Sequence, residues 1–357
     1  MSGHLMPFRH ARSPRSALPT VMSFLLLGVV RPVWVAGQEA LPPNLDTAVS
    51  KGLAHLARQQ NAEGFFGGSQ SKSATTGLSI LAFLSSGHTP DLGRYGLVMR
   101  NAEDWLVAHQ SPDGYFDPSD RGIYPQAIAT LALAETYGVE FTADRRLRVH
   151  AALLKATHVI LAVQEVPKSQ PAFAGGWSYE ASSANVSLPL TAWNVLALRA
   201  VRDCGIPVAE PALHKAMEFV LRCYDPTAKA FGRRPGDAAR PGATGAEILC
   251  LYLLDTDDTH GRRIDDAWAY LEVHPIDANS PFAYHATYYV AQAAFRRGGE
   301  TWSKTGRASL ERLIKLQDKD GSWPPGKARN EASRTDSTAL ALQTLALPYR
   351  LLPSYQR

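Results

Sequence analysis

The segment HQSPDGYF, residues 109–116, decides the fold because it recurs in altered form along the chain. Its distinguishing residues are Gln110, Gly114 and Phe116. The related segments are QQNAEGFF (59–66), QEVPKSQPAFAGGW (164–177), CYDPTAKAFG (223–232) and LQDKDGSW (316–323). A further segment, HPIDANSPF (274–282), keeps the spacing but lacks the Gln and the Gly. The period of roughly 45–55 residues predicts a repeat built from two helices.

Each segment separates two stretches that have the periodicity of helices. Before the first segment, Leu45, Val49, Leu53 and Leu56 recur at the spacing of an amphipathic helix. The stretches that follow the segments are apolar on nearly every side, which predicts buried helices. They are TTGLSILAFL (75–84), PQAIATLALAE (125–135), LTAWNVLALRA (190–200), TGAEILCLYLL (244–254), HATYYVAQAAF (285–295) and STALALQTLAL (337–347). The sequence therefore predicts an all-α fold, a single α/α toroid of six two-helix repeats with inner helices ringed by outer ones.

The residues of the recurring segments have structural explanations. Gly64, Gly114 and Gly321 can adopt the positive φ that ends an outer helix. The aromatic residue can pack beneath the loop, and the preceding Gln can bond the loop backbone. We interpret these residues as structural links between helices and not as catalytic groups.

The first 37 residues differ from the rest of the chain. They contain four arginines and no acidic residue, and the apolar run ALPTVMSFLLLGVV (17–30) precedes the small residues VAG (35–37). This order predicts a secretory signal peptide over 1–37, followed by a linker (38–44), the toroid (45–350) and a C-terminal tail (351–357). We therefore expect export to the periplasm or the exterior, with no integral membrane span after signal removal.

Charge argues against a nucleic-acid partner. The chain has 37 Lys+Arg and 33 Asp+Glu, so removal of the four arginines in the first 37 residues leaves 33 of each. A chain near neutrality gives no electrostatic support for nucleic-acid binding.

The recurring Gln, Gly and aromatic residues resemble the QW motifs of the prenyltransferase and squalene-oxidase repeat family. That group includes the squalene-hopene (terpenoid) cyclases and the β-subunits of protein prenyltransferases. The resemblance covers residues 45–350 and is nearest to small exported bacterial repeat proteins of undefined activity. It implies a squalene-cyclase-like toroid with an isoprenoid or lipid-like ligand. The Asp-x-Cys pair of the prenyltransferase zinc site does not occur in this sequence, so we expect no metal and no cofactor.

Two acidic strings invite comparison with the D-x-D-D acid of the cyclases. LDTDDTHG (254–261) contains that string, but it follows the fourth apolar stretch and is expected in a turn on the rim opposite the recurring loops. TDSTAL (335–340) instead places Asp336 at the start of the sixth inner helix, where the resemblance would put the proton donor. Arg334 and Ser337 replace the other two acids, and an Asp beside an Arg is expected to be ionised and a poor acid.

The candidate site residues lie where the inner helices begin, since free N–H groups and helix dipoles there favour polar ligands. Asp336 and His285 are the candidate catalytic residues. The candidate ligand-binding residues are Tyr124, Trp193, Glu247, Tyr284 and Tyr288. Each of these residues also has a structural explanation. Ser333-x-x-Asp336 and Thr244-x-x-Glu247 have the spacing of helix capping boxes. The aromatic residues and His285 can be packing residues of the core.

Three functions remain open at this point. The first is a toroid that binds an apolar ligand or acts as a scaffold without catalysis. The second is a terpenoid- or lipid-active enzyme that uses Asp336 as acid with His285 nearby. The third is a carbohydrate-active α/α barrel, which needs two facing carboxylates, here Asp336 with Glu247; Asp117, Asp120 and Glu180 are weaker candidates.

Overall fold

The computed structural model describes residues 41–67, 71–116, 121–140, 142–180, 185–255, 259–328 and 331–352. The predicted signal peptide, residues 38–40 of the predicted linker, residues 353–357, Asp117, Asp120, Asp257 and Asp258 lie outside these ranges. No helix in the described ranges combines the length and the apolar character that a bilayer crossing requires.

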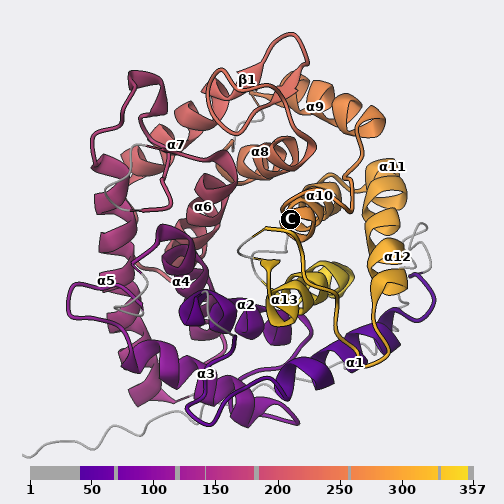
Figure 1. Ribbon diagram of the computed structural model, residues 1–357. Coiled ribbons are helices and arrows are strands. Elements are labelled where there is room, and N and C mark those ends of the chain that lie inside the picture. The colour runs from indigo at the N-terminus through magenta and orange to yellow at the C-terminus, as the bar shows by residue number, and fades with distance from the viewer. Residues whose placement is uncertain are drawn as a thin grey trace, which may run out of the picture. The chain divides into compact units, whose positions relative to one another are not determined.

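Six inner helices form a closed ring (Figure 1). They are α2 (Lys72–Ser85), α4 (Ile123–Tyr137), α6 (Leu188–Asp203), α8 (Pro241–Leu254), α10 (Ala283–Arg297) and α13 (Arg334–Leu345). Each packs against the next, and α13 packs against α2 to close the ring. The prediction of an all-α toroid is confirmed, and each inner helix contains nearly all of its predicted apolar stretch.

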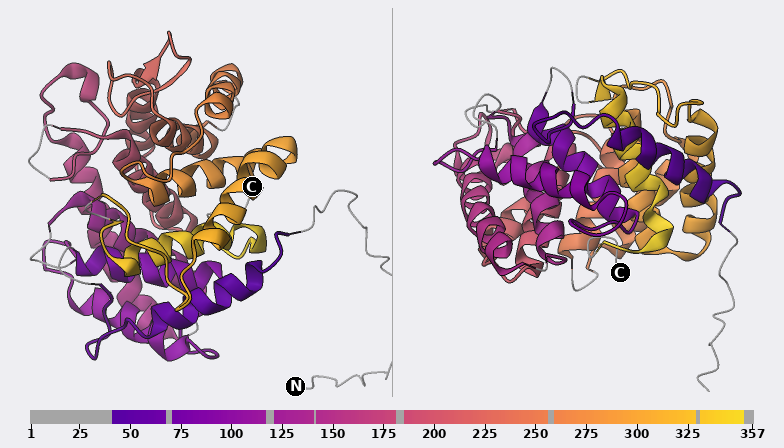
Figure 2. Two further views of the ribbon diagram at one scale, coloured as in Figure 1. Left: turned by 45° about the vertical axis from the view of Figure 1, so that its right-hand side comes forward. Right: turned by 90° about the horizontal axis from the view of Figure 1, so that it is seen from below.

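The outer layer follows the ring in the same order (Figures 1 and 2). It consists of α1 (Leu45–Ala57), α3 (Gly96–Ala108), α5 (Ala143–Glu165), α7 (Glu210–Arg222), α9 (Gly261–Val273) and the run α11 (Gly299–Thr301), η2 (Trp302–Gly306) and α12 (Arg307–Leu316). A short antiparallel hairpin of β1 (Tyr224–Asp225) and β2 (Ala230–Phe231) and two 3₁₀ turns, η1 (Pro171–Phe173) and η4 (Leu347–Tyr349), complete the named elements. Burial separates the layers: every residue of α2 after Lys72 is buried, whereas α7 buries one stripe.

The loops at 59–66, 109–116, 164–177 and 316–323, here called the QW-type loops, join neighbouring repeats through their Gln side chains. Gln317 Nε2 donates to Gly321 O at 3.0 Å and to Ala48 O of α1 at 2.8 Å, so the last loop is bonded to the first outer helix. Gln60, Gln110 and Gln164 make the equivalent pairs of bonds. The predicted role of these Gln residues in bonding the loop backbone is thus confirmed.

The aromatic residue of each QW-type loop is bonded to the start of the next inner helix. The amide of Trp323 donates to Thr338 Oγ1 at 3.1 Å, and its indole donates to Leu313 O at 2.8 Å. Corresponding amide bonds reach Thr76, Gln126 and Thr191, and the hairpin residue Phe231 bonds Thr244 in the same way. The recurring polar residue near the start of these inner helices therefore accepts the loop amide.

Glycine is required in these loops for two reasons, which Gly321 illustrates. Its φ is +90°, where an L side chain is strained, and a Cβ there would lie 2.4 Å from Lys51 O of α1. Gly64 and Gly114 also have positive φ, as predicted.

Candidate ligand-binding pocket

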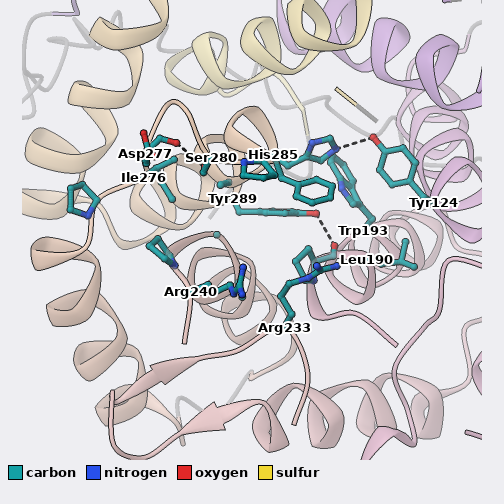
Figure 3. Close-up of a pocket in the computed structure, with 18 of the residues that line it drawn as sticks. Tyr124, Leu190, Trp193, Arg233, Arg240, Ile276, Asp277, Ser280, His285 and Tyr289 are labelled. Atoms are coloured by element: carbon teal, nitrogen blue, oxygen red, sulfur yellow. Dashed lines mark hydrogen bonds between the residues drawn. The ribbon is translucent and has the colours of Figure 1, made fainter. Parts of the chain in front are cut away.

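A pocket of about 430 Å³ opens at the rim where the inner helices begin (Figure 3). Its lining comes from the first two turns of α4, α6, α8 and α10, from the segment 275–282, and from Tyr179 and Arg233. This is the rim at which the sequence analysis placed the candidate residues. The volume lies within the range of small-molecule sites, roughly 300–1,000 Å³.

The loop at 274–282, here called the fifth loop, forms one wall. It provides Pro275, Ile276, Ser280 and Pro281 to the lining, together with Asp277. Phe282 adopts a φ of 63°, which is strained for a residue with a side chain. The segment that departs from the QW pattern is therefore the one that lines the pocket.

Aromatic side chains make the inner walls. Trp193 and Tyr289 are almost fully buried, and the hydroxyl of Tyr289 donates to Pro189 O at 2.7 Å (Figure 3). Tyr288 lies outside the lining and stacks on Trp193, with ring centroids 5.2 Å apart and an interplanar angle of 6°. Tyr284 also lies outside the lining, and its hydroxyl donates to Pro324 O at 2.9 Å. Of the four predicted aromatic residues, the structure brings Tyr124 and Trp193 to the pocket.

His285 connects the pocket to a buried carboxylate. Its Nδ1 lies 2.6 Å from Glu331 Oε1, and its backbone N–H donates to the same oxygen at 2.8 Å. Its Nε2 lies 2.9 Å from the hydroxyl of Tyr124 (Figure 3). Because Oε1 already accepts a backbone N–H, it favours Nδ1–H as a second donor, which leaves Nε2 to accept from Tyr124 when the ring is neutral.

Glu331 was missed by the sequence analysis. It lies in the segment between α12 and α13, is fully buried, and its own carbonyl accepts from Gly326 N and Ser337 Oγ. Nothing in the local sequence marks this glutamate, since its partner His285 is 46 residues away.

Positive groups lie at the mouth. Arg233 and Arg240 line the pocket, and the guanidinium of Arg233 lies 5.7 Å from the ring of Phe282. Within the described ranges, Arg240 has no ion pair or side-chain hydrogen bond. The first-turn amides of α8 at Gly242 and Ala243 likewise have no acceptor there, because Pro241 begins the helix without a side-chain cap. Free amides and the positive end of a helix dipole attract an anion.

Asp336 lies outside the pocket lining and has the capping geometry. Ser333 Oγ accepts the amide of Asp336 at 3.0 Å, and the carboxylate accepts the hydroxyls of Ser333 and Thr75, both at 2.6 Å. Burial raises the pKa of Asp336, opposed by these two hydrogen bonds. The expectation that Arg334 ionises it is wrong, because Arg334 pairs with Asp318 instead.

Glu247 also lies away from the pocket lining. It is fully buried within α8, and neither carboxylate oxygen has a hydrogen-bond partner among the described residues. Burial raises its pKa well above the ordinary value. The capping-box interpretation is wrong, because α8 begins at Pro241 and the hydroxyl of Thr244 bonds Phe231.

The acidic string at 255–258 begins where α8 ends, as predicted. Asp255 accepts the hydroxyl of Thr259 at 3.0 Å and the amide of His260 at 2.9 Å, directly before α9. These bonds give Asp255 a role in the turn between an inner and an outer helix.

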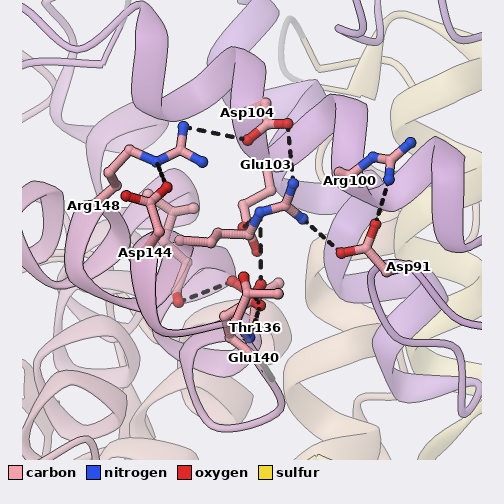
Figure 4. Close-up of polar contacts among 11 residues, drawn as sticks. Asp91, Arg100, Glu103, Asp104, Thr136, Glu140, Asp144 and Arg148 are labelled. Carbon is pink, nitrogen blue, oxygen red and sulfur yellow. Dashed lines mark hydrogen bonds and ion pairs between the residues drawn. The ribbon is translucent and has the colours of Figure 1, made fainter.

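A second acidic cluster lies in the outer layer around Arg145 (Figure 4). The guanidinium lies 3.0 Å from Asp91 and 3.3 Å from Asp104, and 3.8 Å from both Glu103 and Glu140. Burial raises the pKa of Glu103 to about 7. The cluster joins α3 to α5 and the loop before α3, and we interpret it as a link between outer helices. Across the described ranges, no group of three His, Cys, Asp or Glu residues is arranged to hold a metal ion.

Comparisons with known proteins identify the fold. No family model matches the chain, and no curated protein does. Among solved structures, the α-1,6-mannanase GH76A from Salegentibacter sp. HEL1_6 has a TM-score of 0.61 at 12% identity, covering 85% of this chain and 98% of its own. The type II terpene cyclase MstE from Scytonema has a TM-score of 0.53 at 16% identity, covering 87% and 99%.

A possible member of the GH105 family from Salmonella enterica has a TM-score of 0.59 at 12% identity, covering 93% of this chain and 98% of its own. A variant of MstE was solved with geranylgeranyl dihydroxybenzoate bound as substrate. At these identities the likeness extends to the fold alone. The chain therefore has the α/α toroid that terpene cyclases and glycoside hydrolases share, and the resemblance to the prenyltransferase and squalene-oxidase repeat family remains a prediction.

Proposed function

We propose that this chain is an exported toroid that binds an amphipathic small molecule, with an isoprenoid or fatty chain in the pocket and an anionic head group at its mouth. The observation that carries the proposal is one cavity that combines aromatic walls with a guanidinium and two helix amides, none of which has a partner among the described residues. An apolar site with a few convergent polar groups is the usual form of a ligand pocket.

The apolar part of the ligand follows from the walls. Trp193, Tyr289, Leu190 and Ile276 offer aromatic and aliphatic surface, and burial of apolar area contributes roughly 25 cal/mol per Å². A chain or ring system without hydroxyl groups suits such walls, since a polar group without a partner there costs free energy.

The anionic part follows from the mouth. Arg233 and Arg240 face one lining carboxylate, Asp277, which accepts the amide of Asn279 at 2.8 Å. Arg240 and the amides of Gly242 and Ala243 would hold a carboxylate, sulfate or phosphate by charge-assisted hydrogen bonds. A carbohydrate hydrolase would need two facing carboxylates, and this lining has one. Asp336, the candidate acid of a terpenoid-active enzyme, does not line this pocket.

Calorimetric titration with tetradecanoate tests the proposal. We expect binding to the mature chain and weaker binding of tetradecanol, which has the same chain without the charge. Arg240→Gln should weaken tetradecanoate binding by about tenfold. Arg234→Gln is the matched control, because Arg234 pairs with Asp237 and does not line the pocket. Equal affinity for acid and alcohol, or no binding of either, would contradict the proposal.

Export is tested separately. The full-length chain expressed with its first 37 residues should appear in the periplasm or medium, with a new N-terminus near Gln38 by intact mass. Retention of the complete N-terminus in the cytoplasm would contradict this part of the proposal.

A further inference from the structure

A hydroxyl and an imidazole of the pocket lining form one hydrogen-bonded row with a carboxylate buried behind them. His285 Nδ1 lies 2.6 Å from Glu331 Oε1, and His285 Nε2 lies 2.9 Å from the hydroxyl of Tyr124. The hydroxyl belongs to a side chain that lines the pocket, whereas Glu331 is fully buried behind the imidazole. A nucleophile bonded to a base, with the base oriented by a third group, is the arrangement that acyl-transfer sites share.

We propose that Tyr124, His285 and Glu331 form an acyl-transfer triad, with the phenolic oxygen of Tyr124 as nucleophile toward a carboxylic ester of a long apolar chain. The inference rests on the proposed function, because the pocket must accept the apolar chain of the ester. Tyr124 and His285 are the catalytic residues, and Glu331 is a positioning residue that acts through His285.

The surroundings hold the imidazole in one orientation. Rings on two sides contact it edge-on: Trp193 at 6.1 Å and Phe282 at 6.4 Å between centroids. Glu331 bonds both the backbone N–H and Nδ1 of His285. The tautomer that accepts the Tyr124 proton at Nε2 is therefore favoured before any ligand binds.

Two features favour charge on the reacting oxygen. Tyr124 is the second residue of α4, so the positive end of that helix dipole lies beside its backbone. A phenol also loses its proton far more readily than an aliphatic hydroxyl, with an ordinary pKa near 10.

The reaction proceeds in two balanced steps with water as the second reactant. In the first step, Tyr124 Oη forms a bond to the acyl carbon, and the phenolic proton moves to His285 Nε2. The bond between the acyl carbon and the alcohol oxygen then breaks, and the alcohol oxygen takes the proton from Nε2. In the second, water attacks the tyrosyl ester and gives one proton to Nε2. The bond to Tyr124 Oη then breaks, Oη takes that proton, and the fatty acid leaves as its carboxylate, with its own proton released to solvent.

Hydrolysis of 4-nitrophenyl tetradecanoate tests the triad. We expect release of nitrophenolate above the rate in buffer, and a loss of about 100-fold or more in Tyr124→Phe and in His285→Gln. The matched control is Tyr252→Phe, whose hydroxyl bonds Trp268 away from the pocket. Glu331→Gln should lower kcat by about tenfold with little change in KM, because the carboxylate that orients the imidazole through Nδ1 is lost while the pocket lining is kept.

Covalent trapping tests the triad without an ester substrate. Hexadecanesulfonyl fluoride should sulfonylate wild-type protein at Tyr124, located by peptide mass mapping. Tetradecanoate binding by wild type and Tyr124→Phe is measured alongside. Tetradecanoate binding without ester turnover or an adduct at Tyr124 would overturn the triad and leave the ligand pocket intact. If tetradecanoate does not bind, the proposed function fails, and the triad falls with it.

Discussion

The loop at 316–323 and the loop at 274–282 occupy equivalent positions in successive repeats, between an outer and an inner helix. The first is closed: Gln317 bonds the loop and α1, Gly321 touches α1, and Trp323 is fully buried beneath it. The second lacks these residues, leaves Phe282 only partly buried in a strained conformation, and lines the pocket.

This difference shows how a ring of similar repeats can acquire a site. Where the Gln, Gly and aromatic residues are present, the rim is occupied by hydrogen bonds and a buried ring. Where they are lost, prolines hold the backbone away from that arrangement. The space at the start of α10 then becomes available to a ligand. In this chain, the loop that has lost the repeat pattern is the loop that lines the pocket, and this is where we propose that the ligand binds.

The largest contrast is expected at the aromatic positions of the two loops. Trp323→Ala removes a fully buried indole and its bond to Leu313 O, and should lower the free energy of unfolding by about 4 kcal/mol. Phe282→Ala should cost about 1 kcal/mol, because the ring is only partly buried. Urea unfolding of both variants measures the difference; similar losses would mean that the two loops are structurally equivalent.

The second contrast concerns the glycine. Gly321→Ala places a Cβ against Lys51 O at positive φ, and we expect the free energy of unfolding to fall by about 3 kcal/mol. Gly205→Ala is the matched control, since its φ of +79° is also positive but nothing lies within 4 Å of a Cβ there. Its loss should be about 1 kcal/mol. If chemical denaturation gives the same loss in the free energy of unfolding for both variants, the contact between residue 321 and α1 does not contribute to the cost of the substitution.

The third contrast concerns the Gln position. Gln317→Ala removes two hydrogen bonds and leaves the carbonyls of Ala48 and Gly321 without this donor, at a cost of about 2 kcal/mol. His274 stands at the start of the fifth loop and is exposed, so His274→Ala should change stability by about 0.5 kcal/mol or less. A comparable loss in both variants would remove this distinction between the loops.

The smallest effect is expected at Asp336, which belongs to the closed sixth repeat. Because burial raises its pKa, the folded chain keeps a proton that the unfolded chain releases above pH about 4. The stability of wild type relative to Asp336→Asn should therefore be greatest in acid and decline as the pH rises through the folded pKa. Thermal unfolding from pH 3 to 7 measures this decline, and a rise instead would contradict the sign. Tetradecanoate affinity should not change.

The fold was predictable because the inner helices are apolar on every side, and only burial in a ring accommodates six such helices. The predicted structural roles of Gln317 and Gly321 are observed. The site was predictable in part. Tyr124, Trp193 and His285 line the pocket. Asp336 does not, because α13 contributes nothing to the lining, and Glu247 does not, because the lining residues of α8 end at Ala243.

Glu331 and Arg240 are among the site residues that escaped prediction, each for a physical reason. Glu331 reaches His285 only through the path of the segment between α12 and α13, which no local pattern specifies. Nothing in the sequence distinguishes Arg240 from other surface arginines. Its position beside the first-turn amides of α8 becomes evident only from where that helix begins. The missing Gln and Gly of the fifth loop were visible in the sequence and could have located the pocket.

Hydrogen–deuterium exchange with and without tetradecanoate measures both kinds of loop in one experiment. We expect slower exchange in residues 240–246 and 274–286 when the acid is present, with the loops at 109–116 and 316–323 unchanged. Equal protection of all loops, or no protection of the fifth loop at saturating acid, would contradict the claim that the altered repeat forms the ligand site.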